Sequence, residues 1–295
     1  MYAITIGTFD GIHKGHKYIL NNTLEIAKKE NLKPLAIMLK YPIGKYYNGF
    51  EGLIFPSWER KKIIEDMGFE VQVINMEDVW HIEHPDYLDI LLKRGMKHII
   101  CGEDFRFGRG AKGNTKYLLD KSFEKNFRVT ILHDLKSDDF RVSSTKIRSL
   151  IKNGSIKEAN YLLEKNWTVE GHVYEDRHVG FKLGFPTANI DIREQEDIIY
   201  PKYGVYLVKG YIEGYSSYLW GLTSAGIRPT YFEEKKVPKI ETYFMDFFGN
   251  LYGKNVKIEF YDFLRPELKF TSEKDLIDAM MKDEDKARNI IQNIL

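Results

Sequence analysis

The chain has 295 residues, which at about 150 residues per domain predicts two domains, and its 43% hydrophobic and 29% charged residues exclude disorder, collagen and coiled coil. Its single cysteine, Cys101, excludes a disulfide scaffold and a cysteine-rich zinc module. The 44 Lys and Arg residues nearly balance the 43 Asp and Glu residues, which argues against a binder of nucleic acid or of an anionic membrane.

Up to about residue 141, short apolar runs alternate with longer amphipathic stretches. The apolar runs cover residues 3–6, 35–39, 71–74, 98–101 and 129–132. The amphipathic stretches include residues 18–29, 57–67 and 85–93. Their apolar residues recur every three or four positions, as in helices that cover a sheet. This alternation predicts an α/β domain built on a doubly wound parallel sheet of about five strands. Two more helices, 144–152 and 155–164, complete the domain, so we place its boundary after residue 164.

Beyond residue 167 the pattern changes to short β-rich runs separated by turn residues. These runs cover residues 168–174, 204–212, 218–223, 239–246 and 256–263. Their spacing predicts an antiparallel β-barrel or sandwich, and a helical pattern over residues 272–294 follows it. The second domain is therefore expected to span residues 165–295.

A glycine-rich turn with two histidines follows the first apolar run. It reads Gly7-Thr8-Phe9-Asp10-Gly11-Ile12-His13-Lys14-Gly15-His16 and leads from a predicted strand into a predicted helix. A helix N-terminus offers unpaired N–H groups, glycines allow close approach, and imidazoles donate hydrogen bonds to phosphate oxygens. The turn therefore predicts an anion site, although surface histidines in a strand-to-helix turn would give the same pattern.

A second polar segment lies where the helix at residue 144 begins. It reads Arg141-Val142-Ser143-Ser144-Thr145-Lys146-Ile147-Arg148. Taken alone, its hydroxyls are those of an ordinary helix cap. Taken with the two histidines, its cations and hydroxyls fit the transfer of a nucleotidyl group, whose pyrophosphate must be stabilised as it leaves.

A third segment, Gly184-Phe185-Pro186-Thr187-Ala188-Asn189, belongs to the second domain. In a strand, Thr187 and Asn189 point to the same side and offer two oxygen donors to a magnesium-bound phosphate. A proline turn that leads into an edge strand is the alternative interpretation.

Two other patterns carry less weight. The segment from Gly108 to Gly113 satisfies GxGxxG, but it does not open a helix directly after the first strand, as a dinucleotide fingerprint does. A zinc site built from His13, His16, Cys101 and Asp104 would have a spacing that fits no familiar zinc framework.

The histidine and serine segments, with Gly102-Glu103-Asp104-Phe105-Arg106-Phe107-Gly108 between them, resemble the FAD synthetase domain of the bacterial bifunctional riboflavin kinase and FAD synthetase, an HxGH nucleotidyltransferase. The resemblance implies that the FMN phosphate attacks the α-phosphorus of ATP while His13 and His16 hold the ATP phosphates. It implies further catalytic roles for Asp104, Arg141, Ser144 and Arg148, ATP contacts from Gly7, Phe9, Asp10, Gly15, Ser143 and Thr145, and a flavin contact from Phe107.

The second domain resembles riboflavin kinase over about residues 168–290. The resemblance rests on the order of the segments 183–189, 203–206, 226–231, 251–254 and 264–270, with Glu241 before Asp246-Phe247. It implies a six-stranded barrel, ATP contacts from Gly184 and Pro186, Mg²⁺ at Thr187 and Asn189, Glu241 as the base for the riboflavin 5′-hydroxyl, and Arg265 near the flavin on a movable flap. The chain departs from the family pattern at Phe181, near a common arginine position, and at Ser224, where asparagine is common.

The combined expectation is a bifunctional enzyme that phosphorylates riboflavin to FMN and adenylylates FMN to FAD, with ATP and Mg²⁺. Its partners are then small molecules, without nucleic acid or membrane, and a sequence lacking a signal-peptide pattern and any run of about 18 apolar residues favours the cytoplasm. Two alternatives stay open. The N-terminal domain could adenylylate another phosphate monoester, such as phosphopantetheine or nicotinate mononucleotide, or the chain could be a flavin-binding sensor without turnover.

Overall fold

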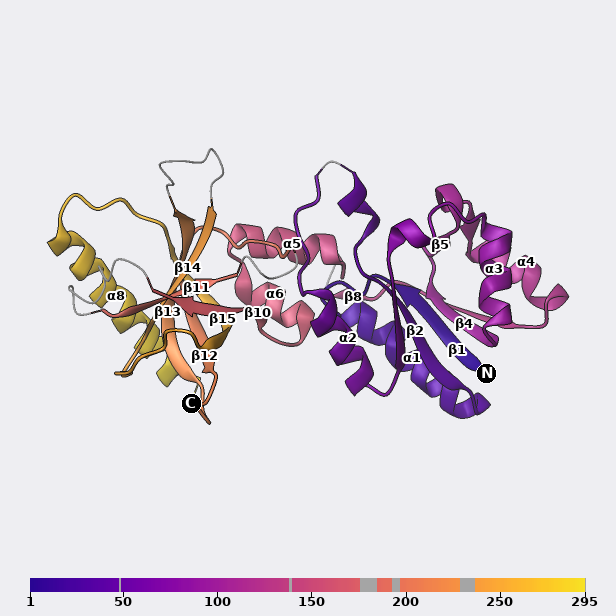
Figure 1. The fold of residues 1–295 in the computed structure, drawn as a ribbon, viewed down its shortest axis with the longest axis horizontal. Coiled ribbons are helices and arrows are strands. Elements are labelled where there is room, and N and C mark those ends of the chain that lie inside the picture. Colours follow the sequence, from indigo (N-terminus) through magenta and orange to yellow (C-terminus); the bar gives the residue numbers. More distant parts are fainter. Residues whose placement is uncertain (48, 138–139, 176–184, 193–196, 229–236, 295) are drawn as a thin grey trace. The chain divides into compact units, whose positions relative to one another are not determined.

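The computed structural model describes residues 1–47, 49–137, 140–175, 185–192, 197–228 and 237–294. The chain divides into two compact units, Met1–Lys146 and Ile147–Leu295 (Figure 1). No helix among the described residues is long and apolar enough to cross a membrane.

Five parallel strands of the described chain form the sheet of the N-terminal unit, in the order β3-β2-β1-β4-β7. They are β1 (Tyr2–Gly7), β2 (Lys33–Leu39), β3 (Glu70–Ile74), β4 (Met96–Gly102) and β7 (Arg128–Leu132). Each predicted apolar run lies within one of these strands, so the predicted sheet is confirmed. The chain leaves the central strand β1 toward β2 and β3, then crosses to β4 and β7 on the other side. The topological switch point therefore lies between β1 and β4, where open α/β sheets bind ligands beyond the carboxyl ends of the strands.

Helices cover both faces of this sheet, because its strands bury alternate side chains in opposite directions. They are α1 (Lys14–Glu30), α2 (Ser57–Asp66), α3 (His84–Lys93) and α4 (Thr115–Glu124). Within β2, Ala36 and Met38 pack with residues of α1 and α2, whereas Leu35 and Ile37 pack with residues of α3 and α4. The doubly wound arrangement is confirmed. The helix α4 is not among the predicted elements, although its Asn114 cap, which accepts the Tyr117 N–H at 2.8 Å, is a recognisable start signal.

Short elements connect the larger ones. The pairs are β5 (Arg106–Phe107) with β6 (Gly113–Asn114) and β8 (Lys136–Ser137) with β9 (Phe140–Arg141), and 3-10 helices cover Ile43–Tyr46, Met76–Asp78 and Arg109–Ala111.

The predicted helix pair between the two folds is present as α5 (Ser144–Asn153) and α6 (Ile156–Leu163). Most of it packs with the C-terminal unit, since the Lys202 N–H donates to the Ile151 carbonyl at 3.2 Å and Asn160 Nδ2 donates to the Phe260 carbonyl at 2.8 Å. The boundary between the two compact units therefore lies between residues 146 and 147 of the chain. The functional boundary after residue 164 stays a prediction.

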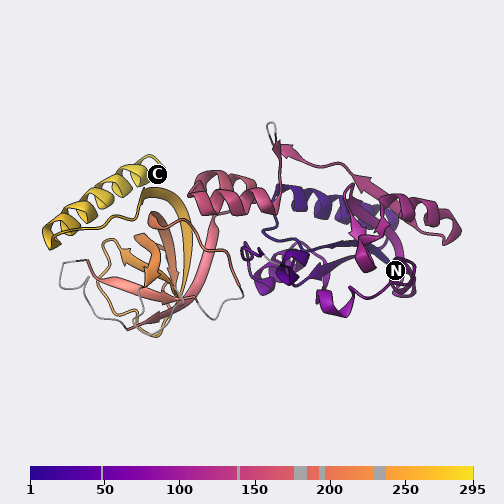
Figure 2. The same cartoon turned by 90° about the horizontal axis from the view of Figure 1, so that it is seen from above.

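Six described strands of the C-terminal unit close into an antiparallel barrel, in the order β10-β11-β14-β13-β12-β15 (Figure 2). They are β10 (Trp167–Tyr174), β11 (Thr187–Asp191), β12 (Gly204–Ile212), β13 (Leu219–Arg228), β14 (Val237–Phe244) and β15 (Asn255–Pro266), and α8 (Glu273–Gln292) follows. The structure therefore selects the barrel over the sandwich and confirms the terminal helix.

The side chains of β14 alternate between the barrel interior and its outer wall. Thr242 is fully buried and shares a hydrogen bond of 2.6 Å with the equally buried Thr223 of β13. Glu241 and Tyr243 consequently lie on the outer side. That side is partly covered by α8, whose Ala287 packs with Leu222 of the barrel. Glu241 of β14 therefore lies on an outer wall of the barrel that is partly covered by α8.

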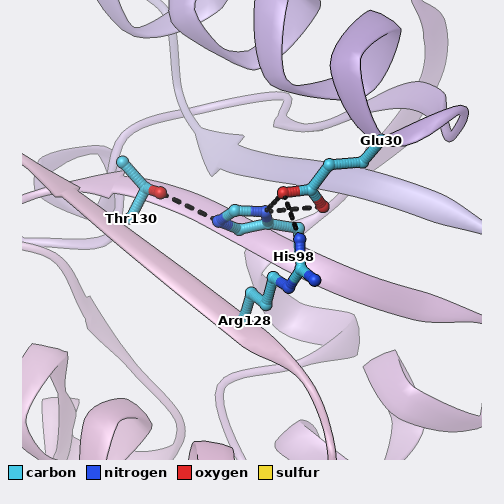
Figure 3. A network of polar contacts seen from close by, with 4 residues as sticks. All are labelled: Glu30, His98, Arg128 and Thr130. Carbon is cyan, nitrogen blue, oxygen red and sulfur yellow. Dashed lines mark hydrogen bonds and ion pairs between the residues drawn. The ribbon is translucent and has the colours of Figure 1, made fainter.

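The C-terminal end of α1 is fixed to the sheet by a polar network around the buried His98 (Figure 3). Nδ1 of His98 lies 3.0 and 3.1 Å from the two carboxylate oxygens of Glu30, and its Nε2 lies 2.8 Å from the Thr130 hydroxyl. Arg128 donates to Glu30 at 2.8 Å. Since α1 carries the two histidines at its other end, this network helps to hold the helix that presents them.

Replacing Glu30 should weaken the N-terminal unit. Burial raises the pKa of Glu30, but hydrogen bonds from His98 and Arg128 outweigh it and hold this pKa below its ordinary value. The carboxylate therefore stabilises the fold above the unfolded pKa, and this stabilisation is lost as pH falls through the folded pKa. We expect Glu30→Gln to lower the free energy of unfolding by about 1–3 kcal/mol at pH 7 and by less at pH 4. Hydrogen exchange of the β4 amides in urea measures this, with the exposed Glu25→Gln on the same helix as control. Equal effects of the two substitutions would contradict the prediction.

Candidate active sites

His13 and His16 lie together at the N-terminus of α1, as predicted. His13 is the N-cap residue, and its Nδ1 accepts the His16 N–H at 3.4 Å. The two rings stack with centroids 3.8 Å apart at 19°. Because Nδ1 of His13 accepts this bond, a neutral His13 carries its proton on Nε2. The pair lies just beyond the carboxyl end of β1, at the switch point of the sheet.

His16 is held as a neutral imidazole. Burial lowers its pKa well below the ordinary 6.5, and the nearby His13 and Arg60 lower it further. Among the described residues, nothing forms a hydrogen bond with its buried Nδ1. Burying a ring nitrogen without a hydrogen-bond partner costs free energy, and a ligand that hydrogen-bonds to this nitrogen would recover it.

The other residues of the histidine turn shape the backbone that carries the pair. Asp10 is buried, and its Oδ1 accepts the Ile54 N–H at 2.9 Å. Phe9 is buried at φ 50° with its ring against His16. A Cβ on Gly15 would lie 3.3 Å from the His13 ring, which is tighter than ordinary contact. A Cβ on Gly7 would lie 3.2 Å from the Phe9 ring. The structure thus gives these four residues packing and turn functions, and their ATP contacts stay predictions.

The serine segment meets the histidine turn. Ser144 Oγ donates to the Asp10 carbonyl at 2.8 Å. Ser143 Oγ accepts the Lys146 N–H at 3.3 Å and so caps α5, while Thr145 is exposed. Arg148 lies one turn further along α5, in the other compact unit, so it is not placed relative to the histidines.

Arg141 is held by two carboxylates at the same edge of the sheet. Its Nη2 pairs with Asp104, which follows β4, and its Nε lies 2.9 Å from Asp134, which follows β7. Hydrogen bonding to Asp104 raises the pKa of Arg141. Asp104 and Arg141, predicted separately as site residues, are therefore in contact. Asp134 was not predicted, because a lone acidic residue in a loop carries no signal.

A cavity of about 670 Å³ adjoins the histidine turn. It is lined by Ile6, Gly7, Thr8, Leu39, Ile43, Tyr47, Met76, Val79, Trp80, Tyr87, Phe105, Arg106, Phe107, Gly108, Gly110 and Ala111. We call it the aromatic pocket. Phe107 is on its wall, stacked on Phe105 with ring centroids 5.6 Å apart. The volume and the aromatic lining suit one planar organic ligand. Tyr47 and Trp80 come from segments that the sequence did not single out.

Of the two weaker sequence patterns, the GxGxxG segment contributes Gly108 and Gly110 to the wall of the aromatic pocket, and the zinc pattern forms no metal site among the described residues. A Cβ on Gly108 would lie 2.5 Å from His84, so this glycine lets the loop pack on α3. No group of three or more His, Cys, Asp or Glu side chains in the described ranges could hold a metal. Cys101 lies in the core on the α3 and α4 side of the sheet, where burial raises its pKa to about 12.

The barrel brings Thr187, Asn189 and Glu241 together on neighbouring strands. Asn189 of β11 is directly opposite Glu241 of β14, and Ser224 of β13 is opposite Glu241 on its other side. Thr187 Oγ1 donates to Glu241 Oε1 at 2.6 Å, and Lys239 Nζ lies 2.6 Å from Glu241 Oε2. The contact between Thr187 and Glu241 spans 54 positions of sequence, so no local pattern reveals it.

The predicted magnesium residues offer a suitable donor set. Asn189 is buried, and its Oδ1 has no hydrogen-bond partner within the described part of the chain. The Thr187 hydroxyl and the Glu241 carboxylate lie beside it. These hard oxygen donors are the ligands that Mg²⁺ takes, so the residues fit the ion.

Two cavities share Thr187 as part of their walls. The larger, of about 700 Å³, is lined by Val173, Pro186, Thr187, Ala188, Phe244, Phe247, Phe248, Gly249, Asn250, Leu251 and Tyr252. The smaller, of about 380 Å³, is lined by Thr187, Val205, Leu222, Ser224, Lys239, Glu241, Tyr243, Arg265, Glu267, Leu268, Phe270, Leu276, Met280 and Asp283. Pro186 is thus beside the larger cavity, whereas Gly184 and Phe181 lie outside the described residues.

Arg265 lines the smaller cavity in a fixed orientation. Its Nε and Nη2 pair with the two Asp283 oxygens at 2.9 and 2.8 Å, and its guanidinium lies 5.7 Å from the Phe270 ring centroid. Asp283 is almost buried on α8 and was not predicted, since it resembles any acidic residue of an amphipathic helix.

Comparison with known proteins gives a consistent result for both units. Residues 1–146 match the FAD synthetase family model and residues 163–291 match the riboflavin kinase family model. The bifunctional riboflavin kinase/FMN adenylyltransferase of Bacillus subtilis is 31% identical over 99% of this chain and 93% of its own length. That of Listeria monocytogenes is 31% identical over 97% and 91%. A solved structure described as a macrolide-efflux protein from Streptococcus pneumoniae shares the fold with a TM-score of 0.86 and 25% identity, over 97% of this chain and 94% of that one. The chain belongs to the bifunctional riboflavin kinase/FMN adenylyltransferase family.

Proposed function

We propose that the N-terminal unit transfers the adenylyl group of ATP to FMN and that the barrel transfers the γ-phosphoryl group of ATP to riboflavin. One observation carries the proposal: each unit has a ligand-sized cavity directly beside the polar residues of its own motif. We assign residues 1–164 to the first activity and residues 165–295 to the second, in a cytoplasmic enzyme.

In adenylyl transfer, the flavin ring occupies the aromatic pocket, with Phe107 on its wall. An FMN phosphate oxygen attacks the α-phosphorus of ATP, and the bond from that phosphorus to the bridging oxygen of the β-phosphate breaks. Pyrophosphate leaves with the electron pair. His13 and His16, at the positive end of α1, donate hydrogen bonds to the charge that develops on it. Arg141 adds positive charge and Ser144 adds a hydroxyl contact around the phosphates.

In the kinase reaction, riboflavin occupies the smaller barrel cavity and ATP the larger one, so the two substrates meet at Thr187. Glu241 takes the proton of the 5′-hydroxyl, whose oxygen attacks the γ-phosphorus as ADP leaves. Thr187 orients Glu241 through their hydrogen bond. Mg²⁺ held by Thr187 and Asn189 would neutralise charge on the ATP phosphates. Arg265 contacts the flavin while Asp283 fixes its guanidinium.

Incubation of the intact chain with riboflavin, ATP and Mg²⁺ tests the proposal, with the flavins separated by chromatography and detected by fluorescence. We expect FMN to form first and FAD to follow. FMN without FAD would contradict the N-terminal assignment, and competition of FMN with phosphopantetheine and nicotinate mononucleotide in a pyrophosphate-release assay would then identify the acceptor. Flavin binding without any product would favour the sensor instead.

A further inference from the structure

Arg60 of α2 is a fully buried arginine in the N-terminal unit. Its guanidinium donates hydrogen bonds to the main chain of several separate segments. Nε donates to the Phe55 carbonyl at 3.1 Å, and Nη2 donates to the Lys40 carbonyl at 2.6 Å. Nη1 donates to the Thr8 carbonyl at 2.5 Å and to the Leu39 carbonyl at 3.3 Å. One side chain thus joins the turn after β1, the end of β2 and the segment before α2.

A buried cation is expensive unless its donors are satisfied, and here carbonyl dipoles satisfy it. The planar guanidinium presents its donors in a fixed fork, which fixes the directions of the carbonyls that accept from it. A lysine ammonium is a compact point charge on a flexible stem and cannot reach the same set of acceptors. The arrangement therefore depends on arginine and not merely on positive charge.

The segments joined by Arg60 form a wall of the proposed adenylyl-transfer site. Thr8 and Leu39 line the aromatic pocket, and Thr8 also lies in the turn that leads to His13 and His16. Asp10 of the same turn accepts the Ile54 N–H. The segment before α2 is therefore joined to the turn twice, once by this hydrogen bond and once through Arg60, which donates to both Phe55 and Thr8. Because Arg60 is fully buried, it acts on substrates through the main chain and not by touching them.

We propose that Arg60 is a positioning residue for adenylyl transfer. By holding the main chain at Thr8 and at the end of β2, it fixes the aromatic pocket relative to the histidine pair, so that a bound FMN presents its phosphate to the ATP phosphates. This role rests on the proposed function of the N-terminal unit. A displacement of a reacting group by about 1 Å lowers the reaction rate about 100-fold, and we expect an effect of this size here.

The test compares Arg60→Lys with wild type in the intact chain. We expect the KM for FMN to rise and kcat/KM for adenylyl transfer to fall about 100-fold, while riboflavin phosphorylation by the barrel of the same molecules is unchanged. Lys62→Gln, on the exposed side of the same helix, is the matched control and should leave both activities at the wild-type level. Hydrogen exchange of the β1 and β4 amides reports whether the N-terminal unit is folded.

The outcomes separate positioning from a purely structural role. If Arg60 only stabilises the fold, the lysine variant loses kcat in proportion to its unfolded fraction and keeps the wild-type KM for FMN, which overturns the proposal. Unfolding of the unit, or unchanged kinetics in a folded variant, overturns it too. If the wild-type chain makes no FAD, the proposed function fails instead, so the two failures are distinguishable.

Discussion

The chain with His16→Ala should form FAD from FMN at least about 100-fold more slowly than wild type, because removal of one preorganised donor from a developing negative charge costs about 10²–10³ in rate. It should still form FMN from riboflavin at the wild-type rate. His16 belongs to a stacked pair at the N-terminus of α1, and its buried Nδ1 finds no hydrogen-bond partner in the described chain. Alanine removes the donor without disturbing the barrel, which is a separate compact unit.

Chromatography of the flavins after incubation with FMN and ATP, and separately with riboflavin and ATP, measures both rates. His81→Ala is a matched control, since His81 is an exposed histidine of the same unit, and both of its rates should equal those of wild type. Equal loss of FAD and FMN formation in His16→Ala would show that the two activities are not divided between the units as proposed. A wild-type rate of FAD formation would exclude His16 from the reaction.

The fold was predictable because buried positions recur at regular spacing in strands and helices, so apolar residues recur at the same spacing in the sequence. Strand β2 buries Leu35 and Ile37 toward one layer of helices and Ala36 and Met38 toward the other, so it reads as a continuous apolar run. The sequence of β11 is less telling, since Pro186 before Thr187 is equally consistent with a turn. There the resemblance to riboflavin kinase, and not the residue pattern, predicted six strands.

The residue pattern alone predicted the sites only where their residues are neighbours in sequence, and the resemblance supplied the distant ones, such as Glu241 beside Thr187. His13 and His16 are three positions apart and meet at a helix N-terminus. Arg60 was missed because a basic residue in a short amphipathic helix reads as solvent-exposed, and nothing in its neighbourhood marks it as fully buried. In the aromatic pocket, Gly7 and Phe107 were predicted as site residues, whereas Tyr47 and Trp80 were missed because they come from separate segments that only the fold brings together.

The resemblance also assigned functions to residues that the structure buries. Phe9 and Asp10 belong to the motif, yet one packs its ring on His16 and the other accepts a main-chain N–H from the segment before α2. A motif contains the residues that build a turn as well as those that touch a ligand. The folded chain shows the turn-building contacts of Phe9 and Asp10, while their ATP contacts stay predictions.

Glu241→Gln should reduce FMN formation from riboflavin by about 10²–10⁴-fold, the contribution of a positioned general base. Glutamine has nearly the same shape and still accepts the hydrogen bond from Thr187, so the cavities keep their walls. It cannot take the proton of the 5′-hydroxyl, and it loses the ion pair with Lys239. FAD formation from supplied FMN should be unaffected, since the N-terminal unit is intact.

Riboflavin binding, followed by flavin fluorescence, separates loss of chemistry from loss of the site, and we expect the variant to bind riboflavin with little change. Glu170→Gln is the matched control, because Glu170 is also a strand carboxylate of the barrel paired with a lysine, Lys257 at 3.6 Å, but it does not line either cavity. That control should phosphorylate riboflavin at the wild-type rate. FMN formation within a few-fold of wild type in Glu241→Gln would show that another group removes the proton, and the hydrogen bond from Thr187 would then serve only to hold β11 against β14.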